Sequence, residues 1–173
     1  MVYRVIAFLL VTVEEGLDLF SHGGASYDIR YITKWSIWLT WLYFLTGMFC
    51  LDPPPRGDKA LLKSMRYGPC RAWKWNMVTF ELAMTFELVS VIAYWALIHD
   101  DVWRPNSRFL SKMTLVLDHF LPLLLLLIDY LFLSNPVFLR RHAYVVASLL
   151  LLYLPINMYF SVAGKPPYSM IDW

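Results

Sequence analysis

Ionisable residues lie inside long apolar stretches of this chain, where their side chains could carry out chemistry. The clearest stretch, residues 109–133, holds Asp118, His119 and Asp129 among many leucines. An ionisable group in hydrocarbon is costly unless it faces a partner or a wet cavity. We therefore expect these side chains to converge inside a helical bundle, and we look for the function of the protein there.

A histidine and a threonine could act as a base and a nucleophile. His119 is the candidate base, because the pKa of histidine lies near neutrality and shifts readily with its surroundings. Thr33 is the candidate nucleophile, since its hydroxyl is a weak nucleophile that needs a neighbouring base. The apolar stretches that contain them begin on the same side of the membrane. However, His119 lies about 13 Å along its helix, which argues against direct contact unless the helix of Thr33 is tilted or starts earlier.

Carboxylates in the third and fourth apolar stretches are candidates for a polar interior, and they are Asp118, Asp129, Glu81 and Glu87. Asp118 and Asp129 share one helical face. They either pair with an Arg or Lys of another helix or line a polar pocket around His119. The two glutamates either form hydrogen bonds between helices or act as a proton relay or cation site, and we favour the hydrogen bonds.

Few residues are spaced for a metal ion or a disulfide. Glu14, Asp18 and His22 recur every fourth residue and could bind a metal, but such a stripe more often lines an exposed or interfacial helical face. No other set has the spacing of a structural zinc site, and we expect no metal and no cofactor. Cys50 and Cys70 lie on the same side of the membrane, so a disulfide between them is open, although nothing else indicates a disulfide framework.

The composition places all these residues in a membrane protein. Of the 173 residues, 59% are hydrophobic and 16% are charged, against about 25% charged in a soluble domain. The net charge of +2 is small and indicates no nucleic-acid partner. We predict an all-α fold, a polytopic membrane bundle of about five transmembrane helices in a single integral membrane domain. The helices are expected at about residues 2–20, 31–51, 73–98, 109–133 and 143–163.

The connecting segments predict the orientation of the bundle. The last four apolar stretches are long enough to cross about 30 Å of hydrocarbon, whereas the first carries acids in its second half. The side that holds the N-terminus has nine of the 15 Lys and Arg residues, and the opposite side has six. This bias predicts an N-terminus on the cytoplasmic or matrix side. We expect an integral protein of the mitochondrial inner membrane or the endoplasmic reticulum.

Several short motifs, in this order and spacing, resemble one known group of membrane proteins. The motifs are Arg30-Tyr31-Ile32-Thr33, His119 with Leu121-Pro122 and Asp129, the stretch PVFLRRH at 136–142 and the tail GKPPYSMIDW at 164–173. Over roughly residues 30–173 the chain resembles the superfamily of androgen-induced and rolling-stone proteins. The chain departs from the family pattern in two ways, because its proline is shifted by two positions and the sixth helix of the family is absent.

The resemblance implies a chemistry for two residues. Members of the androgen-induced branch are multi-pass hydrolases that split fatty acid esters of hydroxy fatty acids. Their nucleophile is a threonine early in the second helix, which corresponds to Thr33. Their base is a histidine of a later helix, ten residues before an acid, which corresponds to His119 with Asp129. The missing helix could open the pocket or leave its place to a partner subunit.

Three functions follow as hypotheses. The first, which we favour from the sequence, is a non-catalytic accessory subunit of a larger membrane assembly, built on this hydrolase-like bundle. The second is an active lipid-ester hydrolase that uses Thr33 and His119. The third is transport or proton relay through the buried carboxylates. The expected partners are membrane lipids and other membrane protein subunits.

Overall fold

The protein folds into long helices that lie side by side. The computed structural model describes residues 2–22, 31–50, 63, 72–98, 109–134 and 138–163, and within these ranges the regular structure is helical. The long helices are α1 (Val2–His22), α3 (Ile32–Met48), α5 (Ala72–Ala93), α7 (Phe109–Ile128) and α8 (Ala143–Val162). Shorter pieces extend three of them, namely η1 (Tyr94–Ile98) after α5, η2 (Asp129–Ser134) after α7 and η3 (Arg140–His142) before α8. The predicted all-α class is therefore confirmed.

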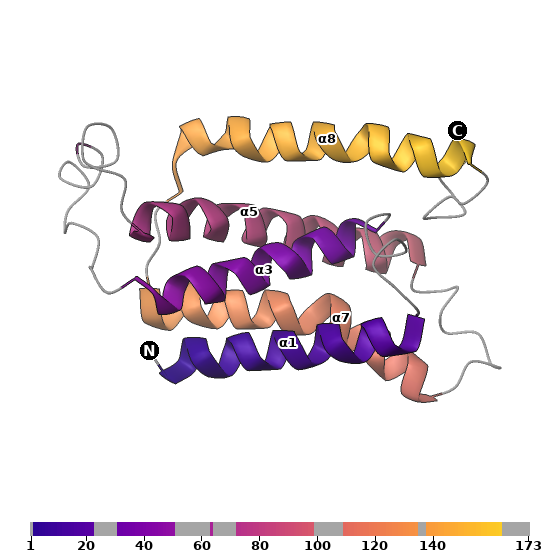
Figure 1. Cartoon of the computed structure of the whole chain (residues 1–173), viewed down its shortest axis with the longest axis horizontal. Coiled ribbons are helices and arrows are strands. Elements are labelled where there is room, and N and C mark those ends of the chain that lie inside the picture. Colours follow the sequence, from indigo (N-terminus) through magenta and orange to yellow (C-terminus); the bar gives the residue numbers. More distant parts are fainter. Residues whose placement is uncertain are drawn as a thin grey trace.

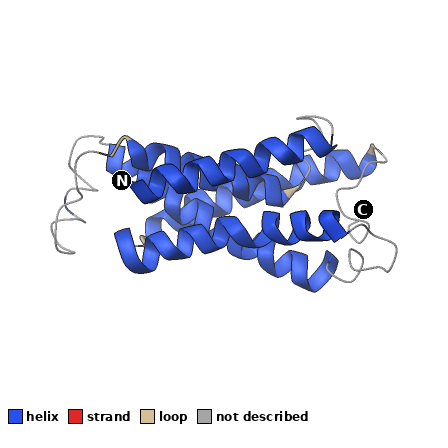
Figure 2. Cartoon of the chain, turned by 90° about the horizontal axis from the view of Figure 1, so that it is seen from below, coloured by secondary structure: helices blue, strands red, loops and turns tan. Residues whose placement is uncertain are grey.

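The helices share one long axis, and α1 begins at the end of the bundle opposite to the end of α8 (Figures 1 and 2). Helix α3 packs between α1 and α5, and α7 packs against α5, α3 and α1. Helix α8 lies on the far side of α5 and packs mainly against it. Because α5 is in contact with α3, α7 and α8, it is the central helix of the fold.

Apolar side chains fill the space between the first four helices. The main core cluster includes Ala7 and Val11 of α1, Ile37 and Phe44 of α3, Phe80 and Ala83 of α5, and Leu123 and Leu126 of α7. Large apolar side chains also cover the outside of the bundle, for example Leu9, Ile92, Phe120 and Leu151. Soluble monomers rarely expose wide apolar surfaces, so this outer surface fits hydrocarbon rather than water.

Among the described residues, three helices are long and apolar enough to cross a membrane, and they span Ala72–Ala96, Leu115–Leu133 and Ala143–Val162. The other two fall short for different reasons. Helix α3 has 17 residues and is only about 25 Å long at about 1.5 Å per residue. Helix α1 includes Arg4, Glu14, Glu15 and Asp18. The membrane class of the fold is thus supported, while the crossing of the membrane by α1 and α3 stays a prediction.

Contacts near its start and along its length hold α8 on the bundle. At its start, the Glu81 carboxylate of α5 lies 2.8 Å from His142 Nδ1 and accepts a 3.1 Å hydrogen bond from the backbone N–H of Leu139. Farther along, the Tyr153 ring packs edge-on against Trp35 with centroids 5.8 Å apart. Only 17% of the α8 span is buried, so α8 is the most peripheral of the three candidate spans.

A glycine allows α1 to approach α3 closely. A Cβ atom added at Gly47 would lie 3.1 Å from Arg4 Nη1 and 3.2 Å from Asn76 Nδ2, whereas one added at Gly16 would meet nothing within 4 Å. Alanine favours a helix over glycine by about 1 kcal/mol. We expect Gly16→Ala to raise the midpoint of thermal unfolding in detergent and Gly47→Ala to lower it. An equal rise in both variants would contradict the close packing at Gly47.

Candidate functional site

The structure brings the two sequence-predicted candidates into contact. Thr33 Oγ1 lies 3.2 Å from His119 Nε2, and each residue is only 7% exposed. The depth argument against this contact was wrong, because the first turns of α7 extend past the start of α3 (Figure 1). The candidate span of α7 starts at Leu115, so His119 lies only about 6 Å inside it. Thr33, as the second residue of α3, lies at a matching depth.

The hydrogen bonds of His119 define its tautomer. Its Nδ1 lies 2.7 Å from the backbone carbonyl oxygen of Leu115. A carbonyl oxygen only accepts hydrogen bonds, so Nδ1 must carry the proton. In the neutral ring, Nε2 then carries a lone pair that can accept the Thr33 hydroxyl proton. The imidazole is therefore oriented as a base toward Thr33.

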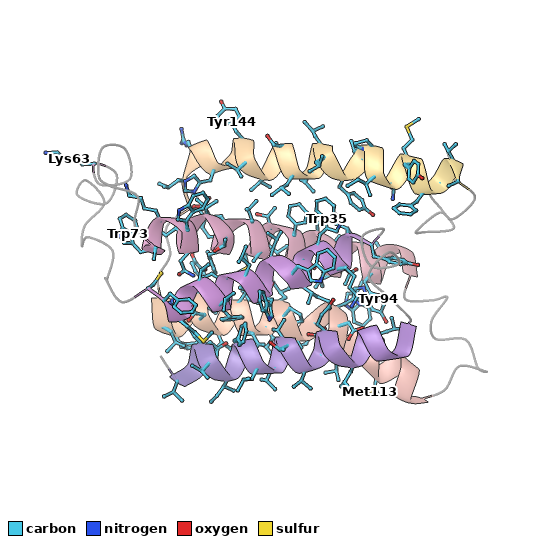
Figure 3. All side chains as sticks on the ribbon, viewed as in Figure 1. Trp35, Lys63, Trp73, Tyr94, Met113 and Tyr144 are labelled. Carbon is cyan, nitrogen blue, oxygen red and sulfur yellow. The ribbon has the colours of Figure 1, made fainter. Side chains whose placement is uncertain are left out.

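Helix α5 adds two further side chains to this pair. Ser90 Oγ donates a 3.1 Å hydrogen bond to Thr33 Oγ1. The Tyr94 ring stacks on the His119 ring, with centroids 4.1 Å apart and an interplanar angle of 27°. Tyr94 is also the first residue of the π-helical turn η1, and such turns often occur at functional sites. Figure 3 labels Tyr94 at the end of the bundle where α3 begins.

Thr33 also benefits from its place at the start of a helix. The N-cap residue Tyr31 has an extended backbone and makes no capping hydrogen bond through its side chain. The first N–H groups of a helix have no partner within it, and the helix dipole is positive at this end. Negative charge that develops on or next to the Thr33 oxygen is therefore stabilised by α3.

Buried carboxyl groups gather beside this pair. Glu14 of α1 lies next to Asp118 of α7, and its other charged neighbours are Glu87 of α5 and Lys34 of α3. Thr40 Oγ1 donates a 2.9 Å hydrogen bond to Glu87 Oε1. Within the described part of the chain, both oxygens of Glu14 are buried without a hydrogen-bond partner. Asp118 thus lies next to another carboxyl group, Glu14, while Lys34 forms an ion pair with Glu15 of α1.

Asp129 lies at the other end of the bundle, away from His119. It forms an ion pair with Arg4 of α1, with Nη2 and Oδ2 3.4 Å apart. The Tyr43 hydroxyl donates a hydrogen bond to the same carboxylate, and Arg4 Nη1 also donates to the Gly47 carbonyl oxygen over 3.3 Å. Ten residues of helix separate Asp129 from His119 by about 15 Å. Asp129 therefore holds α1 to α7 and does not take part in the Thr33 site.

The predicted carboxylates consequently fall into three groups. Glu81 anchors the start of α8 through His142, Asp129 binds Arg4, and Glu87 and Asp118 lie near Glu14. The sequence reasoning did not select Ser90 or Tyr94. A signal for Ser90 was present, because it follows Glu87 by three residues and so shares its helical face.

Some sequence predictions concern residues or side chains outside the described part of the chain. They are Arg30, the side chains of Asp18 and His22, Cys70, Pro136 and Val137, and the tail 164–173. Among the described residues, no group of three His, Cys, Asp or Glu side chains is arranged to hold a metal ion. Cys50 is half-buried, and because Cys70 lies outside the described residues, a disulfide between the two stays open.

No family model, curated protein or solved structure matches this chain. The resemblance to the androgen-induced and rolling-stone proteins therefore depends on the short motifs alone and stays a hypothesis.

The ion pair between α1 and α7 predicts a coupled effect on stability. Asp129→Asn leaves the Arg4 guanidinium without its counter-charge. Breaking a fully buried pair costs about 3 kcal/mol or more, and because Arg4 is 22% exposed, we expect a smaller loss of stability here. The double variant with Arg4→Gln and Asp129→Asn removes both charges and should recover a large part of this loss. Unfolding in a denaturing detergent gradient measures both effects. Simple addition of the two single losses would show that the pair is not coupled.

Proposed function

We propose that this chain is a membrane-embedded hydrolase of lipid esters, with Thr33 as the nucleophile and His119 as the base. The observation that carries the proposal is the 3.2 Å contact between Thr33 Oγ1 and the unprotonated Nε2 of His119. A nucleophile within hydrogen-bond reach of a base that a third group orients is the diagnostic arrangement for covalent catalysis. Here the third group is the carbonyl of Leu115.

The reaction follows from the direction of these hydrogen bonds. His119 Nε2 takes the hydroxyl proton as Thr33 Oγ1 attacks the carbonyl carbon of the ester. The tetrahedral intermediate then collapses, and the leaving alcohol takes the proton from the imidazolium. Water, with His119 again as the base, hydrolyses the acyl-threonine and releases the fatty acid. A positioned base of this kind contributes about 10²- to 10⁴-fold to the rate.

The surroundings of the site favour a lipid substrate. Leu117 and Phe120, which flank His119 in α7, are exposed on the outer surface, while His119 itself faces inward. A lipid that reaches the site from the bilayer would keep its acyl chain against this apolar surface. Low dielectric around the buried pair strengthens the proton transfer and the stabilisation of developing charge.

The family resemblance supports the same chemistry, because its motifs select Thr33 and His119 independently of the structure. The shifted proline is a difference from the family pattern, and the substrate of this chain is proposed only as a class, the esters of long-chain acids. We also propose that α1 and α3 follow the three apolar helices across the membrane. The N-terminus would then lie on the cytoplasmic or matrix side, in the endoplasmic reticulum or the mitochondrial inner membrane, and Thr33 near the opposite surface.

A role as an accessory subunit remains the second proposal. It has one specific support, the small buried share of α8, 17% of its span. The outer side of α8 presents Tyr144, Leu151 and Tyr159, which helices of another subunit could cover as well as lipid. Transport through a line of carboxylates is not proposed, because these groups are divided among three sites.

Activity of variants tests the proposed pair. With a p-nitrophenyl ester of palmitic acid in detergent micelles, Thr33→Ala should lose hydrolysis, and His119→Gln should lower kcat about 10²- to 10⁴-fold because the base is gone. Thr33→Ser keeps a hydroxyl and should keep activity. Thr46→Ala, which removes a hydroxyl from the other end of α3, is the matched control and should behave like the wild type. Full hydrolysis by Thr33→Ala would refute the proposal.

A covalent probe gives an independent test. A long-chain fluorophosphonate should label the peptide that contains Thr33, because an activated hydroxyl attacks the phosphorus. Mass spectrometry should show that the label is lost in Thr33→Ala and reduced in His119→Gln. Labelling of a different residue would contradict the assignment of Thr33 as the nucleophile.

A further inference from the structure

We propose that Ser90 is a third catalytic residue, whose hydroxyl donates a hydrogen bond to the oxyanion that forms when Thr33 attacks the ester. This inference rests on the proposed hydrolase function. It assigns to α5 the role of stabilising negative charge, which neither Thr33 nor His119 can fill.

The donor and acceptor roles along the site run in one direction. The Leu115 carbonyl oxygen accepts from His119 Nδ1, so His119 Nε2 accepts from Thr33. Thr33 has one hydroxyl proton and gives it to the imidazole, and its oxygen therefore has only lone pairs to offer to Ser90. Ser90 must be the donor in the 3.1 Å contact between the two hydroxyl oxygens. The Ser90 proton thus points at the reacting oxygen before the reaction begins.

The same proton is within reach of the oxyanion. On attack, Thr33 Oγ1 forms its bond to the carbonyl carbon, and the carbonyl oxygen, one atom farther on, takes the negative charge. As the new bond forms, the Thr33 Oγ1 lone pair that accepted the Ser90 proton becomes less available. The Ser90 hydroxyl then rotates toward the former carbonyl oxygen of the ester, which carries the negative charge. A preformed donor in a site with little water is the arrangement that stabilises such intermediates, and serine hydroxyls are among the groups that do so.

Backbone donors are scarce in this site, which increases the need for a side chain. His119 and Ser90 both lie inside helices, where each N–H is bonded to the carbonyl four residues earlier. Among the described residues of the site, unused N–H groups are expected at the start of α3, before Lys34 and Trp35, whose N–H groups bond to the Tyr31 carbonyl oxygen. Ser90 approaches Thr33 from a second helix, so the two sources of positive potential converge on the Thr33 oxygen from different elements.

The position of Ser90 is held firmly. It is 1% exposed and lies on the central helix between two residues that also contact the site region. Glu87, three residues before it, is bonded to Thr40 of α3 over 2.9 Å, which fixes the spacing between α5 and α3. Tyr94, four residues after it, stacks on His119. Ser90 is therefore preorganised, as electrostatic stabilisation of an intermediate requires.

The alternative is that Ser90 has a purely structural role. A matched control variant distinguishes this structural role from the proposed catalytic role. Thr46 Oγ1 and Thr79 Oγ1 form a second hydroxyl–hydroxyl contact between α3 and α5, 3.4 Å long, at the other end of the same helix pair. Thr79→Val removes that contact while leaving the reacting atoms untouched. The unfolding midpoints of Ser90→Ala and Thr79→Val should both fall by a similar small amount.

The kinetics should differ between them. Ser90→Ala should lower kcat for the p-nitrophenyl palmitate ester about 10²-fold, with KM almost unchanged, while Thr79→Val keeps the wild-type kcat. Ser90→Cys, of similar size but with a weak donor, should fall in between and keeps the test valid if Ser90→Ala fails to fold. A long-chain trifluoromethyl ketone, whose adduct with Thr33 carries the oxyanion, should bind more weakly to both Ser90 variants.

Wild-type kcat in Ser90→Ala, or an equal loss of kcat in Thr79→Val, would overturn the inference. So would unchanged affinity of the ketone for both Ser90 variants. Thr33→Ala in the same assay identifies which proposal has failed. If Thr33→Ala is inactive and Ser90→Ala is fully active, the hydrolase stands and only the role of Ser90 is wrong. If Thr33→Ala is active, the proposed function itself has failed.

Discussion

The structure depends on one constraint, that polar groups among apolar helices must find their partners on neighbouring helices. Hydrocarbon offers no water to replace a missing hydrogen bond. Several of the described polar contacts accordingly join different helices: Arg4 of α1 to Asp129 after α7, Lys34 of α3 to Glu15 of α1, and Thr40 of α3 to Glu87 of α5. Apolar packing brings the helices together, but it does not select their register. The polar pairs select the register, because the two side chains of each pair can meet only when their helices have one particular rotation and one particular shift along the bundle axis.

The site is a product of the same constraint. Its hydroxyl, imidazole and second hydroxyl come from α3, α7 and α5, and each is buried and bonded to the next. A polar chain of this kind would be costly if one member were missing. What distinguishes this chain from the structural contact between Thr46 and Thr79 is that it contains an imidazole within hydrogen-bond reach of a hydroxyl. The proposed chemistry depends on this pairing of a base with a hydroxyl.

The sequence predicted the helices better than their pairing. The apolar stretches located all five helices within a few residues, because hydrophobic composition is a property of each segment alone. The burial of Asp118 and Asp129 followed from the cost of charge in hydrocarbon. The direct contact between Thr33 and His119 was not expected, because the depth of each residue in the membrane was taken from the start of its apolar stretch. Helix α7 begins at Phe109, well before its candidate membrane span begins at Leu115. Ser90 and Arg4 were not selected, because the role of a serine or an arginine in a helix depends on the residue that it contacts on another helix. The sequence alone does not show that contact.

The ion pair between Arg4 and Asp129 also constrains how the protein is made. The two residues are 125 positions apart in the chain, so the guanidinium of the first helix emerges from the ribosome long before its carboxylate exists. If α1 crosses the bilayer as proposed, an Arg4 guanidinium that still lacks Asp129 is costly in hydrocarbon and is better solvated at the membrane surface. On that proposal, α1 takes its final place after α7 does. The contact between α1 and α7 would then form late in the synthesis of the bundle.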